Sequence, residues 1–203
     1  MTKSILQRLC KFGEIAVFAC FAAPAFAGCI DLSNGNSFSL VRNEPHFAVT
    51  NTISGDGTVV EEREMSRNGA IESVTTTYWN GIIAVDRKSA SSHIQLRISN
   101  DAKLADLSKT GRSYSFPVSI IVNGNEIDRG GIEIRTVRKT KVTIGGCRYS
   151  AMVVRTTTNR ANGDPIYEEA LVSLDAGMLL GNTAMAPDWH PRSGVYFDEI
   201  RAN

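Results

Sequence analysis

The most conspicuous polar cluster in this sequence is Asp188-Trp189-His190, in which a carboxylate, an indole and an imidazole follow one another between two prolines. Such groups could line the mouth of a polar pocket, where the imidazole exchanges protons near neutral pH. The flanking prolines favour instead an ordered loop whose tryptophan packs on the end of a sheet. Trp79 is the second tryptophan, and we take these four residues as candidate pocket residues.

Other signatures of catalysis are missing from the sequence. It contains no Gly-x-Ser-x-Gly turn, no Cys-x-x-Cys redox pair and no phosphate-binding glycine loop ahead of a helix. The remaining histidines, His46 and His93, stand in no spacing that is typical of metal ligands. We therefore predict neither a metal site nor a bound cofactor, and we expect a protein that is not an enzyme.

Paired carboxylates leave one enzymatic alternative open. Glycoside hydrolases place two carboxylates across a cleft, and this chain has Glu61, Glu62 and Glu64 in one predicted strand and Glu168 and Glu169 in another. The more ordinary interpretation is a charged strand face that lies in solvent and discourages edge pairing. A hydrolase of envelope glycans stays as an alternative hypothesis.

The first 27 residues have the composition of a secretory signal. Basic residues near the start are followed by an apolar stretch at 15–23 and by Ala25-Phe26-Ala27, which suits signal peptidase. The apolar stretch is shorter than the roughly 20 residues that span a bilayer. We predict that residues 1–27 are cleaved and that residues 28–203 form a single β domain, either in the periplasm or secreted.

Two cysteines, Cys29 and Cys147, remain after this cleavage. Because compartments outside the cytoplasm are oxidising, we predict a disulfide that fastens an N-terminal strand to the strand beginning at Cys147. An alternative is that Phe26-Ala27-Gly28-Cys29 acts as a bacterial lipobox, which it resembles. Cys29 would then carry a lipid that anchors a lipoprotein in the membrane, and Cys147 would be left unpaired.

Turn signals alternate with short β-rich runs along residues 28–203. Asn-Gly pairs, the strongest short-range hairpin signal, occur at Asn34-Gly35, Asn68-Gly69, Asn80-Gly81, Asn123-Gly124 and Asn162-Gly163. Gly145-Gly146 joins two further runs. These patterns predict an all-β antiparallel meander that forms a barrel, a half-barrel or a sandwich and contains little helix.

Three local patterns add detail to this meander. Residues 93–99 alternate strictly, which predicts that their aliphatic side chains, beginning with Ile94, face the core. Pro117 indicates an edge or a bulge in its strand, because proline donates no ladder hydrogen bond. Residues 101–108 are the one stretch that favours a helical turn.

The charge distribution gives no sign of a polyanionic partner. The formal net charge is +1 and charged residues are interspersed, so the sequence indicates neither nucleic acid nor a charged membrane surface as a partner. Beyond residue 27, no run is long and apolar enough for a transmembrane segment. Aromatic residues are spread along the chain, and they either fill a core or line an apolar pocket.

The segment from Gly145 to Gly181 contains Gly-Gly-Cys-Arg-Tyr, an Asn-Gly-Asp-Pro loop, a tyrosine-containing strand and Asp-Ala-Gly-Met-Leu-Leu. With the signal and the early cysteine, it resembles uncharacterised β-rich periplasmic proteins of Gram-negative bacteria, some of which are similar to lipoprotein-carrier half-barrels. The resemblance implies a curved antiparallel sheet that holds an acyl chain on its concave face. We therefore expect an envelope protein that binds a hydrophobic ligand or another envelope protein.

Overall fold

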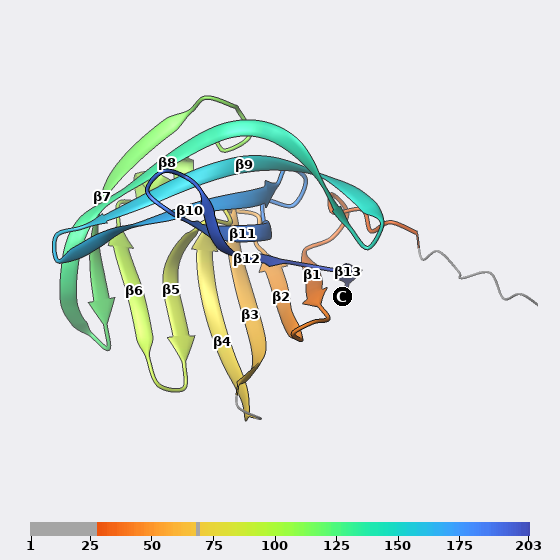
Figure 1. Ribbon diagram of the computed structural model, residues 1–203, viewed down its shortest axis with the longest axis horizontal. Coiled ribbons are helices and arrows are strands. Elements are labelled where there is room, and N and C mark those ends of the chain that lie inside the picture. The colour runs from red at the N-terminus through yellow and green to blue at the C-terminus, as the bar shows by residue number, and fades with distance from the viewer. Residues whose placement is uncertain (1–27, 68–69) are drawn as a thin grey trace, which may run out of the picture.

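A computed structural model describes residues 28–67 and 70–203 (Figure 1). The predicted signal and the predicted Asn68-Gly69 turn lie outside these residues. The described chain forms one antiparallel sheet of thirteen strands and one short 3-10 helix, η1 (Asn100–Leu104). In order, the strands are β1 (Ser37–Arg42), β2 (Phe47–Ile53), β3 (Thr58–Arg67), β4 (Ala70–Trp79), β5 (Ile83–Ser89), β6 (His93–Ile98), β7 (Ser113–Val122), β8 (Asn125–Ile144), β9 (Cys147–Arg160), β10 (Gly163–Ser173), β11 (Leu179–Met185), β12 (Pro191–Tyr196) and β13 (Glu199–Ala202).

The sheet follows the chain from β1 to β12, and each strand pairs with its sequence neighbours. The last strand, β13, departs from this order and pairs with β1 at the opposite edge. Only Phe197 and Asp198 separate β12 from β13, so the chain passes directly from one edge of the sheet to the other. The predicted all-β antiparallel meander is confirmed, and the sheet is not closed into a barrel.

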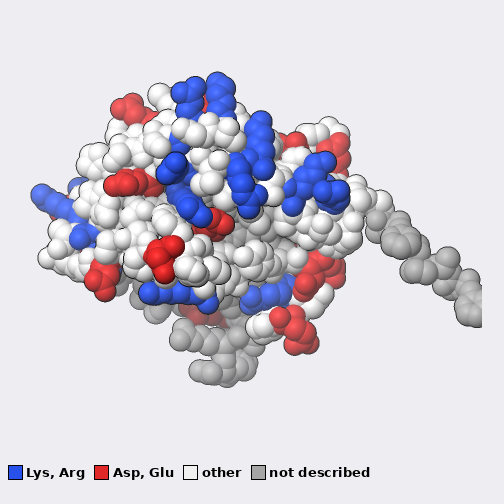
Figure 2. Space-filling model, turned by 45° about the horizontal axis from the view of Figure 1, so that its top comes forward, with Lys and Arg blue, Asp and Glu red and all other residues white. Residues whose placement is uncertain are grey.

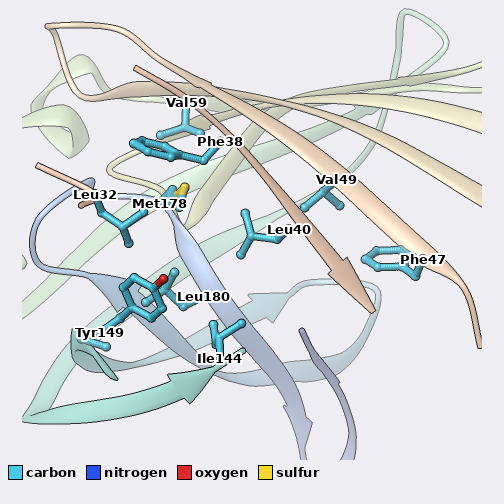
Figure 3. Packing of buried hydrophobic residues seen from close by; sticks show 11 residues of the cluster. Leu32, Phe38, Leu40, Phe47, Val49, Val59, Ile144, Tyr149, Met178 and Leu180 are labelled. Carbon is cyan, nitrogen blue, oxygen red and sulfur yellow. The ribbon is translucent and has the colours of Figure 1, made fainter. Parts of the chain in front are cut away.

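The long strands β8–β10 arch over the shorter strands β1–β6, as Figure 1 shows. Two apolar clusters lie between the two halves of the sheet. The first cluster (Figure 3) consists of Leu32, Phe38, Leu40, Phe47, Val49, Val59, Ile144, Tyr149, Ala151, Met178 and Leu180. The second cluster consists of Ile83, Ala102, Ala105, Leu107, Val118, Ile132, Ile134, Met152, Val154, Ala170 and Val172.

Strand β9 is buried on both of its faces. Tyr149 and Ala151 belong to the first cluster, whereas Met152 and Val154 belong to the second. Since successive residues of a strand point to opposite faces, the β8–β9 hairpin buries one face near its tip and the other face further along. This arrangement explains why the sequence of β9 has an apolar run, Ala151–Val154, in place of an alternating pattern.

The tight turns follow the glycine and asparagine signals of the sequence. Asn123 and Gly124 have φ angles of 50° and 84° and connect β7 to β8. Gly145 and Gly146 have φ angles of 58° and 79° and connect β8 to β9, as the sequence predicts. Positive φ at both central residues matches the twist of a two-residue hairpin, and side chains other than that of asparagine rarely adopt it.

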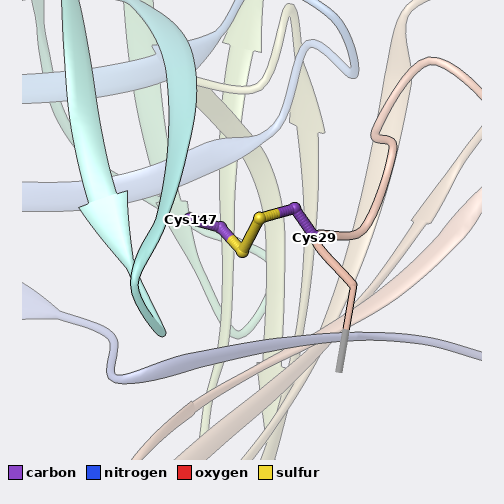
Figure 4. The surroundings of a disulfide bond; sticks show 2 residues. All are labelled: Cys29 and Cys147. Atoms are coloured by element: carbon purple, nitrogen blue, oxygen red, sulfur yellow. A yellow bond between two sulfur atoms is a disulfide. The ribbon is translucent and has the colours of Figure 1, made fainter. Parts of the chain in front are cut away.

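The predicted disulfide is present, and it joins Cys29 to Cys147 beside the hairpin turn (Figure 4). The predicted N-terminal strand is wrong, because residues 28–36 pair with no strand. The reason is local: the Asp31 carboxylate accepts the backbone N–H of Ser33 at 2.9 Å and the side-chain amide of Asn34 at 2.6 Å. Such side-chain bonds fold the backbone into a turn, which competes with a sheet ladder.

Two of the three finer predictions agree with the structure. Pro117 lies one residue beyond the part of β7 that pairs with β6, so at this position β7 is paired with β8 alone. The predicted helical turn at residues 101–108 corresponds to η1. The alternation of β6 is only partly correct, because Ile94 is 37% exposed and lies outside the second cluster, against which Leu96 packs.

Candidate functional site

Three of the four candidate pocket residues lie in the loop between β11 and β12. Asp188 and His190 are exposed and bond each other, with 3.0 Å between the carboxylate Oδ2 and the imidazole Nδ1. Trp189 lies between them with a φ of 65°, a strained value for so bulky a residue. The backbone N–H of Trp189 donates to the carbonyl oxygen of Ala186 at 2.9 Å. The loop thus turns the tryptophan away from its two neighbours.

The Trp189 indole lies over the outer side of β9 and β10. It meets the Tyr167 ring edge-on at 5.7 Å between centroids, and the Arg155 guanidinium lies 4.5 Å from its centre. Arg155 also donates to Glu169 at 2.9 Å. Beside these residues lies an open recess of about 670 Å³, the outer groove, lined by Ser113, Tyr114, Ser115, Glu133, Ile134, Arg135, Arg155, Thr157, Asn159, Tyr167 and Trp189.

Trp79 lies apart from this loop and lines neither of the recesses described here. It packs against the second apolar cluster, and the Lys103 ammonium lies 4.9 Å from its ring centre. Of the four candidates, only Trp189 therefore lines a recess. The structure does not bring Trp79 together with the other three.

A second recess, which we call the interior chamber, lies between the two halves of the sheet and, like the outer groove, opens to solvent. It consists of two adjoining cavities of about 310 and 220 Å³. The residues that line both cavities are Arg63, Tyr78, Glu168, Leu179 and Asn182. Since β3 and β4 supply two of them and β10 and β11 supply the polar pair opposite, the chamber exists only in the folded sheet.

Two charged side chains of the chamber, Glu61 and Arg63, form an ion pair. Glu61 is 4% exposed and accepts two bonds from Arg63, at 3.1 Å from Nε and 2.6 Å from Nη2. The same guanidinium lies 5.2 Å from the centre of the Phe47 ring, which forms part of the chamber wall. Charge pairing and contact with an aromatic face together compensate for the water that Arg63 loses on burial.

Not every polar atom in this region has a partner. The Asn182 amide donates to Glu168 at 3.0 Å, yet its buried Oδ1 accepts no hydrogen bond within the described residues. The Nδ2 atom of Asn51, which pairs across the sheet with Glu61, is likewise buried without a bond. A buried polar group left unpaired costs about 1–3 kcal/mol of stability.

Tyr78 places a partly buried hydroxyl in the wall of the chamber. Burial, and then the nearby charge of Glu61, raise the pKa of its hydroxyl well above the ordinary value of 10.0. Its neutral form is therefore strongly favoured in the fold. The chamber presents a neutral hydroxyl beside an ion pair and an amide.

From the sequence, Glu61 was named only among the carboxylates of the glycan-hydrolase alternative, and Arg63 was not singled out. The charged run of β3 was expected on a solvent face, and this holds for Glu62 and Glu64 but not for Glu61. A signal was present: Glu61 and Arg63 share their strand parity with Val59, which is 2% exposed. Polar residues in register with a buried apolar residue indicate an interior polar site.

No metal site is visible in the part of the chain that the structure describes, where no group of three or more His, Cys, Asp or Glu could hold an ion. His93 instead bonds Asp86 at 2.8 Å. Along residues 28–67 and 70–203, no helix has the length and apolar character needed to cross a membrane.

Comparisons with known proteins assign no function to these recesses. No protein-family model matches the chain. No curated protein matches it either. Among solved structures, the hypothetical lipoprotein YmcC from Escherichia coli is similar, with 12% identity, a TM-score of 0.47, and coverage of 74% of this chain and 76% of that chain. We carry no residue role over from it.

Proposed function

We propose that this chain is a non-enzymatic protein of the cell envelope that holds a small ligand in its interior chamber. The signal-like residues 1–27 and the Cys29–Cys147 disulfide support the envelope location, since disulfides persist in oxidising compartments. The same disulfide argues against the lipoprotein alternative, because a Cys29 sulfur bonded to Cys147 is not free to carry a lipid.

The unpaired Asn182 Oδ1 carries this proposal. Its amide is held by the bond to Glu168, and Asn182 lines both cavities of the chamber, so a small rotation of the side chain would present the buried oxygen to a ligand. A ligand with an O–H or N–H group would satisfy it and recover the cost of its burial. The larger cavity, about 310 Å³, falls at the small end of the range for ligand pockets.

The ligand that fits best has both a polar and an apolar part. Phe47, Leu179, Val195 and Phe197 supply an apolar wall, and the Phe47 and Phe197 rings stack at 6.1 Å. Charged groups interrupt that wall, and burying an apolar chain beside them is unfavourable. We therefore narrow the expected hydrophobic ligand to a compact molecule with a hydrogen-bond donor, in place of a long acyl chain.

A glycan hydrolase is the second candidate function, because Glu61 and Glu168 line the larger cavity together. Each carboxylate is already bonded, one to Arg63 and the other to Asn182. Incubation of the protein with peptidoglycan separates the two functions. We expect no release of reducing sugars, and their release would favour the hydrolase.

The binding proposal is tested by native mass spectrometry of protein purified from its own host. The chain offers a pair of variants, Asn182→Leu and Asn51→Leu, which each replace an asparagine with one buried, unpaired side-chain atom. Only Asn182 lines the chamber. We expect a bound small molecule on the wild type and on Asn51→Leu, and none on Asn182→Leu.

Stability measurements on the same pair complete the test. Asn182→Leu removes both the unpaired oxygen and the bond to Glu168, which act in opposite directions, so the free energy of unfolding of the ligand-free protein should change by less than about 1 kcal/mol. Wild-type protein that carries no small molecule, or Asn182→Leu protein that retains one, would contradict the proposed chamber site.

A further inference from the structure

The β8–β9 hairpin has a high density of positive charge, although the net charge of the whole chain is only +1. Between Glu133 and Asp164 the sequence has seven Lys or Arg residues and no Asp or Glu. Elsewhere in residues 28–203 acidic residues outnumber basic ones. The net charge near zero is therefore the sum of one positively charged region and a negatively charged remainder. Strand alternation spreads these residues along the hairpin, so they form no contiguous basic tract in the sequence.

Four of these residues form what we call the cationic tip: Arg138, Lys139, Lys141 and Arg148. All four are exposed, and none has a carboxylate within 4.0 Å among the residues that the structure describes. Figure 2 shows Lys and Arg side chains gathered over the side of the molecule where the long strands lie. Their charge is therefore not neutralised within the protein.

The tip is also held in a fixed position. Lys141 pairs with Ser150, and Thr143 with Arg148, so Lys141 and Arg148 project from the face of the hairpin opposite to Tyr149. Tyr149 anchors that other face in the first apolar cluster. The adjacent Cys147 is tied to Cys29. Near the turn, one face of the hairpin is thus locked into the core, which leaves Lys139, Lys141 and Arg148 on the opposite face, directed outward. Arg138, which pairs with Val153, is exposed on the other face.

We propose that the cationic tip docks the protein on an anionic phospholipid surface. The tip has positive charge but exposes no large aromatic or aliphatic side chain. Protein interfaces depend on buried aromatic anchors and are depleted in lysine. Adsorption on anionic lipid headgroups needs only the charges, and each Lys or Arg near the surface contributes about 1 kcal/mol, or about fivefold in affinity.

Co-sedimentation with lipid vesicles tests this docking. The full mature chain is mixed at low salt with phosphatidylcholine vesicles containing about 30 mol% phosphatidylglycerol, and separately with pure phosphatidylcholine vesicles. We expect binding to the anionic vesicles only. Because exposed charges are screened by salt, this binding should disappear at high ionic strength.

The decisive variant is Lys139→Gln/Lys141→Gln/Arg148→Gln, whose affinity should fall about a hundredfold. The control removes three exposed cations from other elements, as Arg97→Gln/Arg112→Gln/Arg192→Gln, and should lose much less. If both triple variants lose the same affinity for anionic vesicles, binding depends on the net charge of the protein and not on the tip, and the proposal is overturned.

Two further outcomes would also overturn the docking proposal. One is equal binding of the wild type to both kinds of vesicle, and the other is binding to soluble dextran sulfate without binding to anionic vesicles. The docking proposal shares only the envelope location with the chamber proposal. A failure here leaves the mass-spectrometric test of Asn182 unaffected.

Discussion

The first apolar cluster and the interior chamber are built by the same strands, yet their interiors differ. In β3, Val59 belongs to the cluster, and Glu61 and Arg63 belong to the chamber. In β11, Leu180 is fully buried in the cluster, and Asn182 lines the chamber. A shift of two residues along either strand leads from an apolar core to a polar recess.

This difference separates what stabilises the fold from what does not. Apolar side chains with no exposed surface, such as Phe38 and Leu40, contribute to stability through burial and close packing. The chamber keeps an ion pair and an unpaired amide oxygen, and buried polar groups of this kind rarely stabilise a fold more than apolar residues would. Polar groups that cost stability are expected where a protein binds something.

The largest expected effect concerns the cluster side of this comparison. Cys147 and Ile30 pack against the first cluster, and the disulfide closes a loop of 118 residues. The chain-entropy model predicts that Cys29→Ser/Cys147→Ser lowers the free energy of unfolding by about 5 kcal/mol. Urea denaturation measures the loss. A loss below about 1 kcal/mol would mean that apolar contacts alone hold the N-terminal segment.

The features that the sequence predicted correctly are those with local causes. Asn123-Gly124 and Gly145-Gly146 form turns because their own backbone preferences require it. The Cys29–Cys147 pair follows from there being no other cysteine in residues 28–203. These features depend on residue type and count, and they do not depend on how the two halves of the sheet pack against each other.

The chamber depends on contacts between distant strands, which no local pattern contains. Whether Glu61 faces solvent or the interior is decided by β10 and β11 opposite it, more than 100 residues later in the chain. Trp189 was a candidate from composition alone, but its contacts with Tyr167 and Arg155 come from the fold of the β11–β12 loop. The cationic tip likewise appears only when β8 and β9 are paired.

The next prediction concerns the ion pair of the chamber. Arg63→Met leaves the Glu61 carboxylate buried without its partner, which should cost about 3 kcal/mol, the lower end of the usual range because the Arg63 side chain is 23% exposed. The double variant Glu61→Leu/Arg63→Met removes both charges and should recover most of this loss. Thermal and urea denaturation of both variants give the comparison.

The outward-facing Glu62→Leu serves as the control, with an expected change within about 0.5 kcal/mol. If the double variant is as unstable as Arg63→Met, the arginine acts through its packing on Phe47 and not through charge. The chamber would then resemble the cluster in what holds it together.

The smallest expected effect is a dependence on alkaline pH that arises from Tyr78. Its pKa in the folded protein lies above the unfolded value of 10.0, first because the hydroxyl is buried and then because Glu61 is negative. As the pH rises past 10.0, the unfolded chain loses this proton before the folded one does, so stability that is fully present below that pH is progressively lost. Tyr78→Phe lacks this proton and should lose less stability over the same alkaline range.

Tyrosinate absorbance of the wild type minus that of Tyr78→Phe measures the titration directly. A late titration means that water does not solvate the hydroxyl freely, so the chamber excludes bulk solvent as the apolar cluster does. An ordinary titration near pH 10.0 would mean that the chamber is filled with mobile water. In that case the ion pair would be solvated, and a ligand would have to displace water to reach Asn182. The Tyr78 titration therefore decides whether the two interiors differ in polarity alone or also in access to water.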